Sequence, residues 1–196
     1  MNFRQAEIHL LHRLKTSLSP TLYYHGLHHT LDVVACTERL AEAEGITDPP
    51  TRGLLRMAAL YHDCGFIDTY QGHEEAGCRY VREVLPAFGF DQTALDAICG
   101  MVRATKIPQA PQNRLEEIIC DADLDYLGRD DFEPIARTLF DELRARDLVA
   151  DEPAWDRIQV RFLESHRYWT ATALATRQAP KQAHLARLRA RVRSYA

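Results

Sequence analysis

Several features of other protein classes are missing from this 196-residue sequence. No apolar run approaches the ~20 residues that a transmembrane helix requires, and residues 1–18 mix charged with apolar positions. A basic surplus is absent as well, since 24 Lys and Arg stand against 28 Asp and Glu, for a formal net charge of −4. A long nucleic acid, which requires a basic surface, is therefore not expected as a partner, and neither is a membrane. We expect a soluble protein without a secretion signal.

Cysteine pairs at the spacing of a zinc knuckle are also absent. The five cysteines are odd in number and widely separated, at Cys36, Cys64, Cys78, Cys99 and Cys120. Such a pattern favours reduced thiols over a disulfide framework or a sulfur-rich zinc site. The expected localisation is therefore cytoplasmic.

Glycine and proline are scarce, with nine of each, and they divide the sequence into segments of helix length. Within these segments apolar residues recur at intervals of three and four, while strict alternation is rare. The sequence therefore predicts an all-α, single-domain helical bundle with eight or nine helices. Their expected ranges are about 2–18, 27–44, 50–64, 72–87, 91–104, 113–126, 131–147, 153–177 and 180–195.

One histidine lies on the apolar face of a predicted helix. His29 precedes Val33, Cys36 and Leu40 by four, seven and eleven residues, so it shares their stripe on the helix 27–44. An imidazole buried without a partner costs about 1–3 kcal/mol. Taken alone, a core histidine bonded to a carbonyl explains it more simply than a metal ligand does.

A histidine and an aspartate side by side favour the metal. His62 follows Leu55 and Ala58 on the apolar face of the helix 50–64, and Asp63 comes next. A buried carboxylate costs several kcal/mol unless it is paired or bound to a metal. Two such residues in succession are difficult to explain as packing.

Further acids on an apolar face lie in the run Asp121-Ala122-Asp123, where Asp123 follows Ile119 by four residues. Imidazoles and carboxylates from three helices favour an octahedral divalent cation (Mn, Fe, Co, Ni or Mg) over a structural zinc. Such a cation lowers the pKa of bound water and neutralises a phosphoryl oxygen. Hydrolysis of a phosphate ester is the reaction that this ligand set favours.

The pattern His29, His62-Asp63 and Asp123 resembles the H…HD…D signature of the HD-domain superfamily of metal-dependent phosphohydrolases. The resemblance covers residues 23–131 and implies that all four residues are metal ligands in the middle of a helical bundle. In related HD proteins the last ligand is typically the acid of an Ala-Asp or similar pair followed by an apolar residue, so the resemblance favours Asp123 over Asp121. One HD domain would then fill residues 1–196, with a core at about 23–131 and a C-terminal helical extension at about 132–196.

The run Tyr24-His25-x3-His29-Thr-Leu-Asp32-Val33 resembles a segment of the cyclic-nucleotide phosphodiesterases, which belong to the same superfamily. The resemblance implies that His25 protonates the leaving oxygen and that His29 binds metal. Gly26 stands where these enzymes usually carry asparagine. Their purine-binding glutamine and aromatic residue have no counterpart that can be placed here.

His73 follows Asp63 by ten residues, in a region where two-metal members of the superfamily carry a ligand for a second ion. Residues 98–106 lack the further histidine that such members usually supply, so a second metal stays uncertain. His73 therefore joins His25 and Asp63 as a catalytic candidate. A phosphoryl group also requires a cation. Lys106, one of three lysines, is the first candidate for substrate binding, and Arg103 is the second.

The sequence thus predicts a metal-dependent phosphohydrolase or phosphodiesterase in which metal-bound hydroxide attacks a small phosphate ester, with a nucleotide or cyclic nucleotide as the favoured substrate. The first alternative is a noncatalytic regulatory HD module that binds metal or nucleotide. A di-iron HD oxygenase is the less favoured alternative. The expected partner is a small-molecule ester, and a homodimer formed by the terminal helices stays open.

Overall fold

The computed structural model describes residues 1–195, which are all-α and contain no strand. Nine α-helices and three 3-10 helices make up this part of the chain: α1 (Phe3–Ser17), α2 (Leu27–Ala43), α3 (Pro49–Tyr61), η1 (Cys64–Ile67), α4 (His73–Val84), η2 (Leu85–Phe88), α5 (Gln92–Ala104), α6 (Arg114–Asp123), η3 (Asp125–Gly128), α7 (Phe132–Arg144), α8 (Glu152–Ser165) and α9 (Ala171–Arg193). The all-α prediction is confirmed. None of these helices is both long enough and apolar enough to cross a bilayer.

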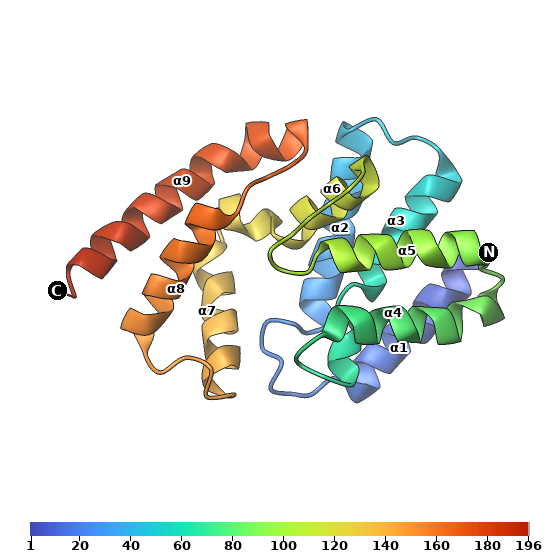
Figure 1. Cartoon of the computed structure of the whole chain (residues 1–196), viewed down its shortest axis with the longest axis horizontal. Coiled ribbons are helices and arrows are strands. Elements are labelled where there is room, and N and C mark those ends of the chain that lie inside the picture. The colour runs from blue at the N-terminus through green and yellow to red at the C-terminus, as the bar shows by residue number, and fades with distance from the viewer. Residues whose placement is uncertain (196) are drawn as a thin grey trace.

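The helices form two neighbouring groups, with α1–α6 on one side and α7–α9 on the other (Figure 1). The first group buries an apolar cluster that includes Leu10, Leu55 and Ile98. The second buries a separate cluster that includes Phe140 and Leu185. The two apolar clusters are separate, so polar residues can be accommodated between them.

Local signals in the sequence place several helix starts. The Asp91 side chain accepts a hydrogen bond from the Ala94 backbone N–H at 2.9 Å and so caps α5. Asp48 caps α3 in the same way, and Pro49 occupies its first turn. Aspartate is common at the N-cap because its side chain accepts a hydrogen bond from a free backbone N–H. Proline is common in the first turn because the N–H that it lacks would have no partner in the helix.

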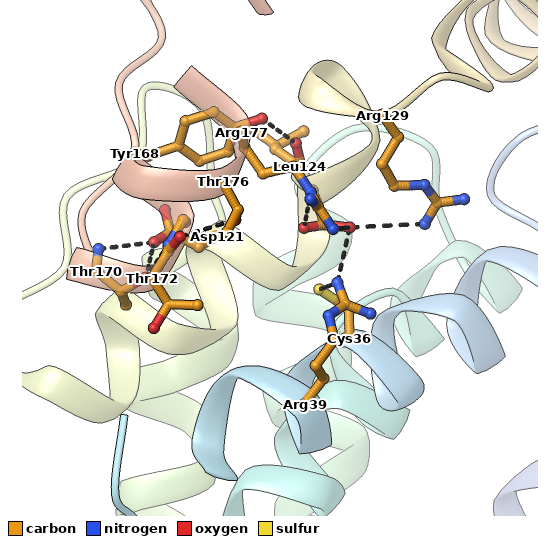
Figure 2. Close-up of polar contacts among 12 residues, drawn as sticks. Cys36, Arg39, Asp121, Leu124, Arg129, Tyr168, Thr170, Thr172, Thr176 and Arg177 are labelled. Atoms are coloured by element: carbon orange, nitrogen blue, oxygen red, sulfur yellow. Dashed lines mark hydrogen bonds and ion pairs between the residues drawn. The ribbon is translucent and has the colours of Figure 1, made fainter. Parts of the chain in front are cut away.

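The predicted helix 153–177 is wrong. Helix α8 ends at Ser165, residues 166–170 are not helical, and α9 begins at Ala171. The buried Asp121 carboxylate accepts hydrogen bonds from the backbone N–H and the hydroxyl of Thr170, both at 2.8 Å (Figure 2). It also accepts one from the backbone N–H of Trp169 at 3.0 Å. Thr170 in turn caps α9. Asp121 of α6 therefore holds the segment at which α8 ends and α9 begins.

The predicted helix start at Pro180 is also wrong, because α9 runs through that residue. Proline inside a helix costs about 3 kcal/mol, since it lacks an N–H and its ring crowds the preceding turn. Helix α9 is anchored on both sides of it. The Arg177 guanidinium donates to Asp125 at 2.8 Å, and the buried Lys181 ammonium donates to the His166 carbonyl at 2.6 Å (Figure 2 shows Arg177). Tertiary contacts thus override the local preference.

Candidate metal centre

Three helices bring a histidine pair and an aspartate together in the interior. His29 lies in the first turn of α2, His62 follows the end of α3, and Asp123 is the last residue of α6. One ligand atom from each lies within 4.8 Å of the other two. The Nε2 atom of His29 is 3.3 Å from Nε2 of His62 and 3.2 Å from Oδ1 of Asp123. This is the arrangement that a shared cation requires.

Asp63 borders this group. Its Oδ2 atom lies 3.1 Å from Nε2 of His62 and 3.5 Å from Nε2 of His29. This oxygen is buried and has no hydrogen-bond partner. A buried acceptor left unsatisfied costs about 1–3 kcal/mol, and more when it is charged. A cation among the four side chains would satisfy it, so the residues present fit a divalent metal.

The orientation of His62 also fits a ligand. Its Nδ1 atom lies 2.8 Å from the carbonyl oxygen of Ala59, to which an Nδ1–H group donates. With the proton on Nδ1, the neutral ring presents the lone pair of Nε2 to the cluster. Ligating histidines commonly hold their second nitrogen in this way, because it fixes both the tautomer and the ring.

Of the two competing aspartates, Asp123 lies in the cluster. Asp121 is turned toward the segment before α9, where Trp169 and Thr170 donate to it. The two side chains point in different directions because they are two residues apart on one helix.

His25 lies in the loop before α2 and is held by a residue of α7. Its Nδ1 atom is 2.5 Å from Oε1 of Glu142. The other carboxylate oxygen accepts the backbone N–H groups of Tyr24 and His25, at 2.8 and 3.0 Å. The Tyr70 hydroxyl donates to Oε1 at 3.0 Å. Glu142 is fully buried, and it leaves Nε2 as the free nitrogen of His25.

His73, the first residue of α4, lies on the other side of Asp63. Its Nε2 atom is 3.4 Å from Oδ1 of Asp63 and 3.7 Å from Oε1 of Glu74. The His73 ring stacks on Phe66 with a centroid distance of 3.9 Å. The two oxygens of Asp63 therefore face different histidines.

A cavity of about 430 Å³ extends from these residues toward α7 and α8. Asp63, Asp123, His25 and His73 line it, together with Lys106. The structure places Arg103, the second predicted substrate-binding residue, away from this cavity. Its guanidinium donates to the Glu75 carboxylate at 2.7 and 2.9 Å, so its charge is neutralised on the surface.

The sequence of residues 26–125, just over half of the chain, matches the profile of the HD domain. The chain belongs to the HD-domain family. Its structure is similar to the crystal structure of a predicted HD superfamily hydrolase from an uncultured Thermotogales bacterium, with a TM-score of 0.62 and 21% sequence identity. The similarity covers 96% of this chain and 92% of that chain, so the shared fold extends beyond the HD-domain match. No curated protein matches the chain.

Burial and charge act in opposite directions in this HD domain. Burial alone would lower the pKa of His62, but the carboxylates of Asp63 and Asp123 outweigh it and hold that pKa well above 6.5. Burial would raise the pKa of Asp123, but the hydrogen bonds and charges of His29 and His62 lower it to about 2. The metal-free cluster therefore keeps a proton on an imidazole, and a cation must displace it.

The metal-free protein is expected to lose stability as the pH rises above 6.5. The pKa of His62 is higher in the folded chain than its ordinary value of 6.5. Its pairing with the carboxylates therefore stabilises the fold fully below that pH and is lost as the pH rises through the folded pKa. A divalent cation would replace the lost proton, so the Tm difference between Mn²⁺-loaded and metal-free protein should widen with pH. Thermal melts in Mn²⁺ and in EDTA measure it, and a constant difference would contradict the expectation.

Glu142 is the site residue that the sequence did not reveal. It is 117 residues from His25, and α7 carries other acids such as Glu133 and Asp141. No local pattern distinguishes it from these acids. Burial would raise the pKa of Glu142, but the hydrogen bond and charge of His25 and the backbone donors lower it. Glu142 is therefore an ionised carboxylate, and it accepts the hydrogen bonds from Tyr24, His25 and Tyr70.

Proposed function

We propose that this HD-domain protein is a metal-dependent phosphohydrolase acting on small phosphate esters. The observation that carries the proposal is the convergence of His29, His62, Asp63 and Asp123, with a buried Oδ2 atom on Asp63 that accepts no hydrogen bond. A divalent cation bound by these residues would lower the pKa of a coordinated water and neutralise a phosphoryl oxygen. The candidates are Mn, Fe, Co, Ni and Mg, because the donors are nitrogen and oxygen.

The other residues of the cavity supply positioning and proton transfer. Glu142 fixes the His25 ring through Nδ1, and Nε2 holds the proton that the leaving oxygen takes. Lys106 binds a phosphate oxygen, and His73 holds the Asp63 carboxylate from the opposite side. The apolar walls contributed by α7 and α8 exclude water from the organic part of the ester.

A panel of phosphate esters with each of the five cations tests the proposal. It should contain p-nitrophenyl phosphate, bis(p-nitrophenyl) phosphate, nucleoside monophosphates and cyclic nucleotides, the last two being the substrates that the sequence favours. We expect hydrolysis that depends on added cation and stops in EDTA. Stoichiometric metal binding without turnover of any ester would contradict the proposal and favour a regulatory module. Oxygen uptake by a protein with two irons would instead favour an oxygenase.

Replacing His25 with alanine should slow the hydrolysis of esters according to their leaving group. An alkoxide needs a proton as it departs, so kcat for an alkyl phosphate should fall about 10²-fold. A p-nitrophenolate leaves without one, so kcat for p-nitrophenyl phosphate should change far less. The control is His28→Ala, which removes an exposed imidazole three residues away. Equal losses on both esters would show that His25 is not the acid.

A further inference from the structure

The geometry points to a more specific substrate: a phosphate monoester of a large apolar alcohol, whose phosphate lies at the His–Asp cluster while its alkyl or aryl group lies between α7 and α8. This inference rests on the proposed function. The inferred substrate differs from the nucleotide that the sequence favours. The inference depends on the half of the cavity formed by α7 and α8, which lie outside the HD motif.

The cavity has two chemically different ends. The metal-cluster end carries the cluster carboxylates, His25, His73 and Lys106. The other end is formed by aliphatic and aromatic side chains of α7 and α8: Phe132, Leu139, Leu143, Trp155, Ile158 and Phe162. A volume of about 430 Å³ suits a small organic ligand, since such sites usually measure about 300–1,000 Å³. The cavity is thus much larger than a phosphate group requires.

Three of the polar side chains along the cavity donate hydrogen bonds within the protein. The Gln159 amide donates to Asp156 at 3.2 Å, and the Thr105 hydroxyl donates to the Val102 carbonyl at 2.8 Å. The Tyr70 hydroxyl donates to Glu142 at 3.0 Å. A nucleobase or ribose would lose water here and find these donors occupied, so its own polar groups would be left without partners. An alkyl or aryl group has no such polar groups and gains from burial.

The charges of the lining favour a single phosphate group. Within the described chain, Lys106 is the lysine that lines this cavity, and no arginine does. Arg103 is neutralised by Glu75, and the lining includes the buried Glu74. The additional phosphates of a nucleoside diphosphate or triphosphate would therefore lack partners. One phosphate requires only Lys106 and the cation of the proposed site.

A series of methyl, butyl and octyl phosphates, with AMP and glycerol phosphate, tests the inference on Mn²⁺-loaded protein. We expect kcat/KM to rise about threefold for each methylene that the cavity buries. Octyl phosphate should exceed AMP and glycerol phosphate by at least about tenfold. A flat alkyl series, or faster turnover of AMP than of octyl phosphate, would overturn the inference while leaving the phosphohydrolase proposal intact.

A binding measurement separates this inference from the proposed function. If no ester is hydrolysed, the proposed function fails, but calorimetry with octylphosphonate and methylphosphonate still reports on the cavity. We expect octylphosphonate to bind at least about tenfold more tightly than methylphosphonate, because its chain fills the apolar end. Equal affinities would overturn the assignment of that end.

A matched pair of substitutions tests whether the preference for a long alkyl chain arises at the apolar end of the cavity. Leu139→Trp narrows the apolar end, so it should lower the ratio of octyl to methyl phosphate kcat/KM at least about fivefold. Leu174→Trp makes the same change on α9 at a side chain that is 46% exposed, and it should leave the ratio unchanged. A ratio unaffected by Leu139→Trp in folded protein would contradict the inference. If that variant does not fold, the wild-type series and calorimetry decide.

Discussion

Replacement of His62 with alanine is expected to remove metal binding and to lower phosphate ester hydrolysis at least about 10³-fold. His62 is fully buried, and its Nε2 atom lies within 3.6 Å of both carboxylates and of His29. Without this imidazole the cluster loses a donor that no neighbour replaces. Metal content after dialysis and kcat with saturating Mn²⁺ measure the two effects.

The matched control is His12→Ala, which removes an exposed imidazole from α1 and should alter neither quantity. Asp123→Asn and Asp121→Asn form a second pair, because the two aspartates are neighbours on α6 but only Asp123 contacts the histidines. We expect Asp123→Asn to weaken metal binding and Asp121→Asn to leave it intact. Retention of stoichiometric, tightly bound metal by His62→Ala would contradict this account of the site.

Replacement of Glu142 with alanine is expected to lower the free energy of unfolding by about 3–5 kcal/mol. The change leaves four donors without their acceptor: the backbone N–H groups of Tyr24 and His25, the His25 ring and the Tyr70 hydroxyl. Urea denaturation measures the loss. Glu133→Ala, on the same helix but exposed, should change stability by less than about 0.5 kcal/mol.

The contribution of Glu142 should depend on pH. Its pKa is lower in the folded chain than its ordinary value of 4.5. The carboxylate therefore stabilises the fold fully above that pH, and this stabilisation is lost as the pH falls through the folded pKa. The stability difference between wild type and Glu142→Ala should shrink in acid. A difference that stays constant or grows below pH 4.5 would show that the ionised carboxylate is not what stabilises the loop.

Much of the fold could be predicted from the sequence because its information is local. The three-and-four spacing of apolar residues, with caps such as Asp91, places most helices close to their observed bounds. The same spacing put His29 and His62 on buried faces, and both are buried in the structure. Buried polar residues on an apolar stripe are expensive, so their presence indicated a site before any geometry was known.

What the sequence could not show depends on contacts between distant segments. The break at residues 166–170 is fixed by Asp121, and the helical path through Pro180 is held by Arg177 and Lys181. Glu142 reaches His25 across 117 residues. The apolar half of the cavity is formed by side chains of α7 and α8. These helices lie beside the HD core (Figure 1). Composition and periodicity do not specify contacts between residues that are this far apart in the sequence.

The most direct test of the central claim is an anomalous diffraction measurement on crystals grown with Mn²⁺. The account predicts an anomalous peak about 2.0–2.4 Å from the ligand atoms of His29, His62, Asp63 and Asp123. A well-diffracting crystal with no peak among these side chains, or with Mn²⁺ bound only elsewhere, would contradict it.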